Sequence, residues 1–260
     1  MTLLVRSRAG VSLTREGEAL LPYLRDVARA HRALSDQAAA LRGLEQGVVR
    51  IGSFNSVSSS LLPRAIKRFK ELHPAIRFEL HQGLYQELER LVRGGVVDFS
   101  FTDLCRTTEF AAQRLFEDEY LAVLPADHPL LHWDAVPTAE FVREPFILLD
   151  EGRGGATLNA FRAAHPDLNV QYRVADDYSV LNMVESRLGV AVLPEMVARN
   201  AQPGVAVRQL DPPLRRTVGV VYRKETELSA AARAFLEVLT EVLSESSFFC
   251  NFPLYNPRGV

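Results

Sequence analysis

VVRIGSFNSVSSSLLPRAIKRFKELHPAIRFELHQGLYQELERLVRGGVVDFSF, residues 48–101, alternates short apolar runs with amphipathic ones. The apolar runs at 48–51, 76–80 and 96–101 predict strands. Apolar residues spaced by three and four over 61–72 and 84–92 predict helices. Strands that alternate with helices through short connections are typical of a parallel sheet with helical crossovers. The stretch therefore predicts an α/β lobe.

A second series of the same kind follows. It predicts strands at 120–124, 146–149, 170–174, 190–193, 205–210 and 217–222, and helices at 156–164, 180–187, 194–199 and 229–243. Pro125 and the Pro212-Pro213 pair mark joints between two lobes. Because the last strand and helix return to the first lobe, the chain crosses twice, and we expect a hinged cleft.

Upstream of the lobes, residues 6–17 read RSRAGVSLTREG. Arg6, Arg8 and Gly10 suit a basic turn, and Ser12 or Thr14 can cap a following helix. Over 14–42, apolar positions recur at alternating spacings of four and three, at Leu20, Leu24, Val27, His31, Leu34, Ala38 and Leu41. This spacing is typical of a coiled-coil seam and predicts a helix that pairs two copies of the chain. His31 either tunes that pairing or lies at the edge of the seam.

The composition is that of an ordinary globular protein, with 47% hydrophobic and 24% charged residues. No apolar run approaches the roughly 20 residues of a membrane span, and residues 2–5 are too short for the apolar core of a signal peptide. Two cysteines fit a reducing compartment, so we expect a cytoplasmic location and no membrane partner. Residues 1–50 are net basic and the remainder is net acidic, which suits an N-terminal part that meets phosphates, although solvated helix faces give similar imbalances.

The ordered set of motifs resembles the LysR-type transcriptional regulators. Residues 5–17 resemble the wing and linker-helix start of that family, and residues 48–52 resemble the first strand of its effector domain. Further matches follow in order at Leu62-Pro63, Phe69, His73-Pro74, Val97-Asp98, residues 127–130 and residues 183–194. The resemblance covers residues 3–243 and implies two Rossmann-like lobes of the type 2 periplasmic-binding-protein kind, preceded by a dimerising linker helix and a winged helix-turn-helix.

The resemblance also implies a domain order. We expect a wing remnant at 1–13, the linker helix at 14–46, lobe I at 47–125 with 217–245, lobe II at 126–216, and a tail of unknown role at 246–260. Because the sequence opens at the wing, we expect the recognition helix to be lacking, through a truncated product or a start upstream of Met1. Arg6 and Arg8 would then touch phosphate weakly, and sequence-specific DNA binding would need the missing N-terminal domain.

Ligands of open α/β sheets bind at the carboxyl ends of strands, where helices begin. Four such junctions occur, at residues 53–60, 102–103, 150–157 and 175–179. The candidate effector contacts are Asn55, Ser56, Ser58, Thr102, Asp103, Asp150, Glu151, Gly154, Thr157 and Asp177. Serines and aspartates before helices are also common N-caps, so each residue alone has a purely structural alternative.

The expected junctions carry mixed electrostatic signals. Helix N-termini favour a carboxylate on the effector. Negative charge gathers at the same junctions, at Asp103, Asp150, Glu151, Asp176 and Asp177. A zwitterion or an amine-bearing effector would satisfy both features. Alternatively, these carboxylates cap helices or pair with Arg153 and Arg173.

Other chemistries find little support in the sequence. His128 and His132 have helical ligand spacing, but Pro129 interrupts the helix, so we expect no metal site. No complete dinucleotide, P-loop or nucleophile-elbow motif is present, so we expect no cofactor and no catalytic residues. Cys105 could sense redox state, although thiols more often act as small hydrophobes.

The sequence therefore predicts a small-molecule sensor that regulates transcription. It would be a homodimer through the helix at 14–42, and a homotetramer if the lobes also pair. The alternative is a two-lobed solute-binding protein without a DNA-binding role, for which the coiled-coil helix has no purpose. An enzyme ranks third, because no acid–base or nucleophile pair emerges from the sequence.

Overall fold

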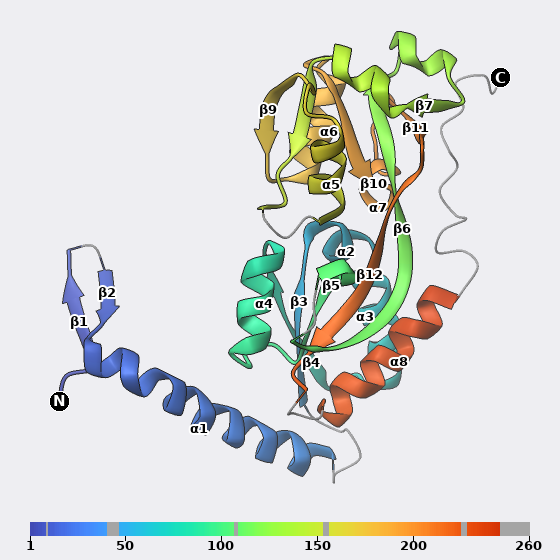
Figure 1. Cartoon of the computed structure of the whole chain (residues 1–260). Helices are drawn as coiled ribbons and strands as arrows, with labels where there is room; N and C mark the ends of the chain where they lie inside the picture. The colour runs from blue at the N-terminus through green and yellow to red at the C-terminus, as the bar shows by residue number, and fades with distance from the viewer. Residues whose placement is uncertain (9, 41–46, 107–108, 153–155, 225–227, 245–260) are drawn as a thin grey trace.

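A body of two lobes carries a long helical arm in the computed structural model (Figure 1). The structure describes residues 1–8, 10–40, 47–106, 109–152, 156–224 and 228–244. The expected α/β architecture with two lobes is confirmed. None of the helices in these described ranges is long and apolar enough to span a membrane.

The arm consists of a hairpin and the helix α1 (Arg15–Ala40). The strands β1 (Leu4–Ser7) and β2 (Gly10–Leu13) pair antiparallel where the residue pattern suggested a basic turn and the family resemblance implied a wing. Thr14 caps α1 as expected, since its Oγ1 accepts a 3.0 Å hydrogen bond from the Gly17 amide. A Cβ at Gly17 would collide with the Leu3 carbonyl oxygen, so glycine lets the hairpin close onto the helix.

Lobe I is a parallel sheet with β3 in its middle, between β4 and β5. Its elements are β3 (Gly47–Ser53), α2 (Asn55–Ser60), α3 (Leu62–Leu72), β4 (Ile76–Gln82), α4 (Tyr85–Arg93), β5 (Phe99–Asp103), η1 (Leu104–Arg106) and α8 (Ala230–Ser244). Phe69 of α3 lies at the centre of the core, with ring centroids 5.7 Å from Phe78 and 5.4 Å from Phe235. These contacts hold α3 and α8 on the same sheet face.

Lobe II repeats the pattern, with β8 between β9 and β10 in parallel. Its elements are η2 (Pro129–His132), β7 (Ala135–Pro137), η3 (Thr138–Arg143), β8 (Phe146–Leu149), α5 (Ala156–Ala164), β9 (Val170–Val174), α6 (Asp177–Glu185), β10 (Val190–Pro194), α7 (Glu195–Ala198) and β11 (Val205–Asp211). A separate apolar core, built around Phe146, Phe161 and Val180, fills this lobe.

Two long strands join the lobes, β6 (Ala111–Pro125) and β12 (Leu214–Tyr222). The first part of β6, up to Tyr120, pairs antiparallel with β12, and its end pairs with β10 and β11 of lobe II. Since β12 also pairs with β5 of lobe I, the two sheets merge (Figure 1). The chain thus crosses to lobe II within β6, upstream of Pro125, and returns to lobe I within β12, downstream of Pro212-Pro213.

Two of the differences from the sequence-based expectation concern β6 and α2. The strand expected at 120–124 begins at Ala111, because its charged first half finds a partner in β12. The serine-rich residues 55–60, expected to precede a helix, form the helix α2 themselves. Ser59 Oγ donates to the Asn55 carbonyl at 2.8 Å, and Ser60 Oγ donates to the Met196 carbonyl of lobe II at 3.1 Å. These tertiary and local bonds offset the weak helix propensity of serine.

Candidate functional site

A cleft of about 280 Å³ lies between the lobes. Lobe I lines it with the start of α2 and with the junction between β4 and α4, and lobe II lines it with the segments after β8 and β9. The lining residues are Phe54, Asn55, Ser56, Gln82, Gly83, Leu84, Tyr85, Glu87, Glu151, Ala175 and Asp177. All of these segments follow the carboxyl ends of parallel strands, where ligands of such sheets bind.

Arg216 lies beneath the cleft on β12, entirely buried, beside the equally buried Asp118 of β6. Its Nη2 donates to Asp118 Oδ2 at 2.6 Å, and its Nε donates to the same oxygen at 3.0 Å. Asp118 Oδ1 accepts a 3.4 Å bond from the Met196 amide of lobe II. A charge-assisted pair of this kind fixes the orientation of the guanidinium.

The same guanidinium reaches both lobes. It donates to Ser56 Oγ at 2.9 Å and to Tyr85 Oη at 3.2 Å in lobe I. It also lies 3.5 Å from Glu151 Oε1 in lobe II. Its central carbon is 4.9 Å from the ring centroid of Phe54, within range of a cation–π contact. Arg216 therefore joins the two lobes at the base of the cleft.

The two cleft carboxyl groups of lobe II are strongly perturbed. Burial raises the pKa of Glu151 to about 7, although Arg216 acts against the shift. Burial likewise raises the pKa of Asp177 to about 6. Glu151 Oε2 accepts a 3.3 Å bond from the hydroxyl of Tyr120, whose own pKa burial raises well above 10. The Tyr120 hydroxyl therefore stays protonated and remains a donor at neutral pH.

Further polar bonds cross from one lobe to the other. Asn55 Nδ2 donates to Asp176 Oδ1 at 3.1 Å. Thr157 Oγ1 donates to Asp103 Oδ2 at 3.0 Å, and both of these side chains are buried. The described conformation therefore holds the lobes together through bonds in which Asn55, Asp103 and Thr157, three of the predicted ligand contacts, take part.

The structure divides the ten candidate contacts into groups. Asn55, Ser56, Glu151 and Asp177 line the cleft. Asp103 and Thr157 bond to each other, and Thr102 is buried in β5. The hydroxyl of Ser58 shares a 2.6 Å hydrogen bond with that of Ser53, and Asp150 is exposed and accepts from the Gly152 amide. Gly154 lies outside the described residues.

Sequence reasoning missed the buried pair at the base of the cleft, Asp118 and Arg216. A signal was present in the strand alternation. Phe116, Asp118 and Tyr120 are successive alternate residues of β6 and all are buried, as are Arg216, Val218 and Val220 of β12. A charged residue at an inward-facing position is therefore the feature that marks each of these two strands.

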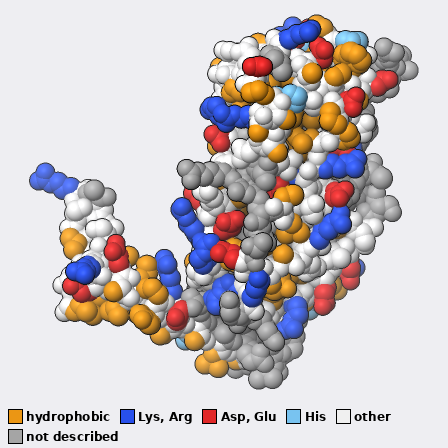
Figure 2. Space-filling view, viewed as in Figure 1, with side chains coloured by type: hydrophobic (Ala, Val, Ile, Leu, Met, Phe, Trp, Pro, Cys, Tyr) orange, Lys and Arg blue, Asp and Glu red, His pale blue; other side chains and the backbone are white. Residues whose placement is uncertain are grey.

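The predicted seam of α1 is exposed in the single chain. Leu24, Val27 and Leu34 are each more than half exposed, His31 is exposed, and Leu20 is half-buried. Figure 2 shows apolar side chains gathered along this arm. Leu41 lies outside the described residues. Arg6 and Arg8 are exposed on and just after β1, at the far end of the arm.

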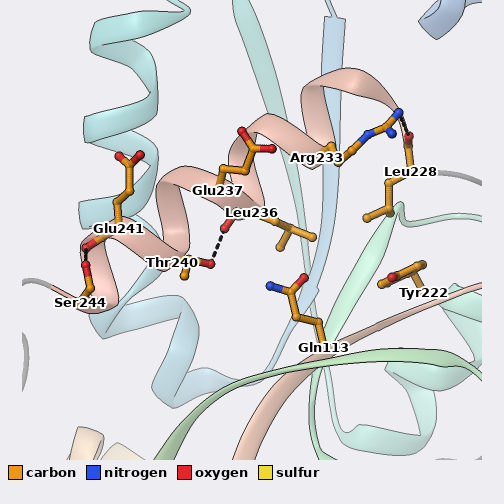
Figure 3. A pocket seen from close by; sticks show the side chains of 9 residues that line it. All are labelled: Gln113, Tyr222, Leu228, Arg233, Leu236, Glu237, Thr240, Glu241 and Ser244. Atoms are coloured by element: carbon orange, nitrogen blue, oxygen red, sulfur yellow. Dashed lines mark hydrogen bonds between the residues drawn. The ribbon is translucent and has the colours of Figure 1, made fainter.

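A larger and more open hollow of about 660 Å³ lies along the side of α8 on lobe I (Figure 3). Gln113, Tyr222, Leu228, Arg233, Leu236, Glu237, Thr240, Glu241 and Ser244 line it. Two of its hydroxyl groups bond to carbonyls of their own helix α8, Thr240 to Leu236 at 2.8 Å and Ser244 to Glu241 at 2.7 Å. The interlobe cleft, which combines buried charge with residues of both lobes, is therefore the stronger candidate site.

The histidine pair considered for metal binding has other contacts. His128 Nδ1 accepts a 3.3 Å bond from the Leu130 amide, and His128 Nε2 lies 3.5 Å from Glu144 Oε2. Within the described ranges, no three His, Cys, Asp or Glu side chains are grouped to hold a metal ion.

Comparison with known proteins agrees with this geometry. The family profile of the LysR substrate binding domain matches residues 42–244. The chain belongs to the LysR family of transcriptional regulators. It is 31% identical, over 244 residues, to the uncharacterized HTH-type transcriptional regulator YvbU of Bacillus subtilis, covering 92% of this chain and 83% of that protein. Such relatives are transcriptional regulators rather than enzymes.

Solved structures of LysR-type regulators share the fold. An OxyR mutant of Corynebacterium glutamicum has a TM-score of 0.71 at 20% identity, with 96% of this chain and 81% of that chain covered. The regulatory domain of CcmR from Synechocystis, in complex with 2-PG, has a TM-score of 0.69 at 19% identity, with 77% and 99% covered. At these identities the likeness concerns the fold alone.

Proposed function

We propose that this LysR-family chain senses a small molecule in its interlobe cleft and thereby controls transcription. The observation that carries the proposal is the placement of Arg216, which contacts Ser56 and Tyr85 of one lobe and Glu151 of the other directly beneath the cleft. A ligand among these groups changes the balance of contacts between the lobes.

In this proposal, transcription responds to the effector because effector binding changes how the two lobes are arranged. A ligand that prefers one arrangement of the lobes shifts the population toward it. In lobe I, α8 packs on the sheet and also contacts α1, so a change in the body is passed to the arm. Effector and DNA binding are then coupled, and the coupling acts in both directions.

In this proposal, the arm holds the copies of the chain together in the oligomer. Two copies pair through the seam of α1, because exposed leucine and valine side chains at heptad spacing are stabilised when they pack against a second helix. Pairing of the lobes extends the dimer to a tetramer. The regulator contacts DNA through a helix-turn-helix of the kind that its relatives' names state, with Arg6 and Arg8 on phosphates.

A two-lobed solute-binding protein without a role in transcription is the alternative function. The exposed apolar seam of α1 disfavours it, since a solute-binding role gives such a helix no use.

The test places a bulky side chain in the mouth of the cleft. Leu84 is 37% exposed and lines the cleft, whereas Leu72 is 53% exposed on α3 and does not line it. RNA sequencing would compare cells that carry the native gene, Leu84→Trp, Leu72→Trp or a deletion, under growth conditions that change the regulated transcripts.

We expect Leu84→Trp to remove the response of those transcripts to growth conditions, while Leu72→Trp keeps it. A Leu84→Trp strain that responds like the native strain would argue against sensing in this cleft. A deletion that changes no transcript would argue against the regulatory role itself.

A further inference from the structure

The groups around the interlobe cleft carry more negative than positive charge. Glu151 and Asp177 line the cleft, and Asp118 lies beneath it. Within the described residues, the positive charge that acts on all three carboxyl groups is that of Arg216. Arg216 is already bonded through two of its nitrogens to Asp118. Glu151 shares this guanidinium at 3.5 Å, and among the described residues no second cation is paired with Glu151 or Asp177.

The excess of negative charge is clearest at Asp177. It is only 7% exposed, yet its carboxylate has no hydrogen-bond partner among the residues that the structure describes. The capping role at the start of α6 belongs to Asp176, whose Oδ2 accepts from both the amide and the hydroxyl of Ser179 at 2.7 Å. A buried carboxylate without a partner is unfavourable, so the described residues by themselves do not account for Asp177.

The opposite wall of the cleft is aromatic. Phe54 and Tyr85 both line it, with ring centroids 5.2 Å apart. Aromatic faces beside carboxylates are a favourable surrounding for a cation, through cation–π attraction together with ion pairing. A ligand carboxylate would instead meet two like charges, and the nearest guanidinium is already engaged.

We propose that the effector carries a protonated amine, and that its ammonium group binds the carboxylates of Asp177 and Glu151 beside the rings of Phe54 and Tyr85. An ammonium group has three donors, so it can serve the Asp177 carboxylate and also add a bond to Glu151, which already accepts one from the Tyr120 hydroxyl. The cavity of about 280 Å³ limits the effector to a small molecule. This inference rests on the proposed function and names the chemical class of its ligand.

The test is isothermal titration of the full chain with three probes that share one carbon skeleton and differ in charge: 3-phenylpropan-1-ammonium, 3-phenylpropanoate and 3-phenylpropan-1-ol. We expect the ammonium probe to bind at least about tenfold more tightly than the carboxylate, since an ion pair in a partly buried site is worth roughly a factor of ten or more. Asp177→Asn and Glu151→Gln should each lower the affinity for the ammonium probe by about tenfold or more.

Asp150→Asn is the matched control, because Asp150 is exposed and lies next to Glu151 without lining the cleft. We expect it to bind the ammonium probe as the native chain does. Asp177→Asn should also raise Tm, by about 4 °C or more, because it removes an unpaired buried charge. Lost binding in a more stable protein cannot be attributed to unfolding.

Three results would overturn the inference: tighter binding of the carboxylate probe, undiminished binding of the ammonium probe by Asp177→Asn, or binding of no probe at all. None of these decides the proposed function, which depends on the transcripts of the Leu84→Trp strain. If the carboxylate probe binds the native chain but not Leu84→Trp, the cleft remains the sensing site, and the proposal that the effector carries an amine is wrong.

Discussion

Arg216 and Asp118 form a fully buried ion pair at the point where the two lobes meet. Replacing Arg216 by Met keeps much of its volume but leaves Asp118 without its cation. Removing one partner of such a pair costs about 3–5 kcal/mol. We therefore expect Arg216→Met to lower the free energy of unfolding by about that amount, as measured by urea denaturation.

The double variant Arg216→Met with Asp118→Leu is the control for this pair. It removes both charges, so it should recover part of the lost stability. A single variant as stable as the native chain, or a double variant less stable than the single one, would contradict the buried-pair account.

Asp177 should make stability depend on pH in a defined window. Its pKa is about 6 in the folded chain, against an ordinary value of 3.8, because burial outweighs the attraction of Arg216, and Asp176 and Asp118 add repulsion. Between these values the folded chain holds the proton more tightly than the unfolded chain, so stability falls as pH rises. The full penalty, up to about 3 kcal/mol, is present above pH 6 and absent below pH 4.

The measurement is the difference in unfolding free energy between Asp177→Asn and the native chain from pH 4 to pH 8. We expect no gain at the acidic end and a gain that grows through pH 6. A gain that is constant with pH, or that shrinks as pH rises, would show that Asp177 is not a buried unpaired carboxylate.

Of the individual residues that line the cleft, some could be predicted from the sequence. Glu151, Asp177, Asn55 and Ser56 follow strands directly, and such junctions are visible in the chain order. The Arg216–Asp118 pair was not predicted, because the two residues are 98 positions apart and meet only through the pairing of β6 with β12.

Among the elements, those with strong apolar periodicity were predicted closely. The helices α3, α4 and α8 and the strands β8 and β10 lie within a few residues of their expected bounds. The first half of β6 and the helix α2 were missed. Their residues are charged or serine-rich, so local preference is weak there and tertiary partners decide the structure.

The start of β10 offers a test of how tightly two elements pack. A Cβ at Gly189 would collide with the Pro145 carbonyl oxygen, which is held in place by a 2.9 Å bond from the Val190 amide. We expect Gly189→Ala to lower the free energy of unfolding by about 1–3 kcal/mol, as overpacking does. Differential scanning calorimetry would measure it, with the exposed neighbour Leu188→Ala as a nearly neutral control. An unchanged Tm for Gly189→Ala would contradict the close approach.

The assembled molecule should depend on α1. Leu24→Glu and Val27→Glu each place a charge in the proposed seam, whereas Arg25→Glu changes a residue on the opposite face of the same helix. Light scattering after gel filtration should give at least twice the chain mass of 29.0 kDa for the native chain and for Arg25→Glu. The seam variants should shift toward the single-chain mass. Equal masses for all proteins would contradict pairing through this face.

Two lobes could be predicted for the whole molecule because the strand–helix series occurs twice along the chain. The predicted proline joints, however, lie only at strand ends: Pro125 is the last residue of β6, and Pro212-Pro213 come just before β12. The lobes are joined by these two strands, which belong to both sheets. The electrostatic imbalance of the cleft was expected from its acidic junctions. The arginine at the base of the cleft contacts both lobes. These contacts could not be predicted from the sequence, because they form only when the chain is folded.

The central claim is that a small molecule binds between the lobes. Native mass spectrometry would test it most directly, after the full chain is equilibrated with the small-molecule fraction of its own cells. We predict one added small-molecule mass per chain for the native protein and for Leu72→Trp, and none for Leu84→Trp. The same added mass in Leu84→Trp, or no added mass in any of the three proteins, would contradict the account.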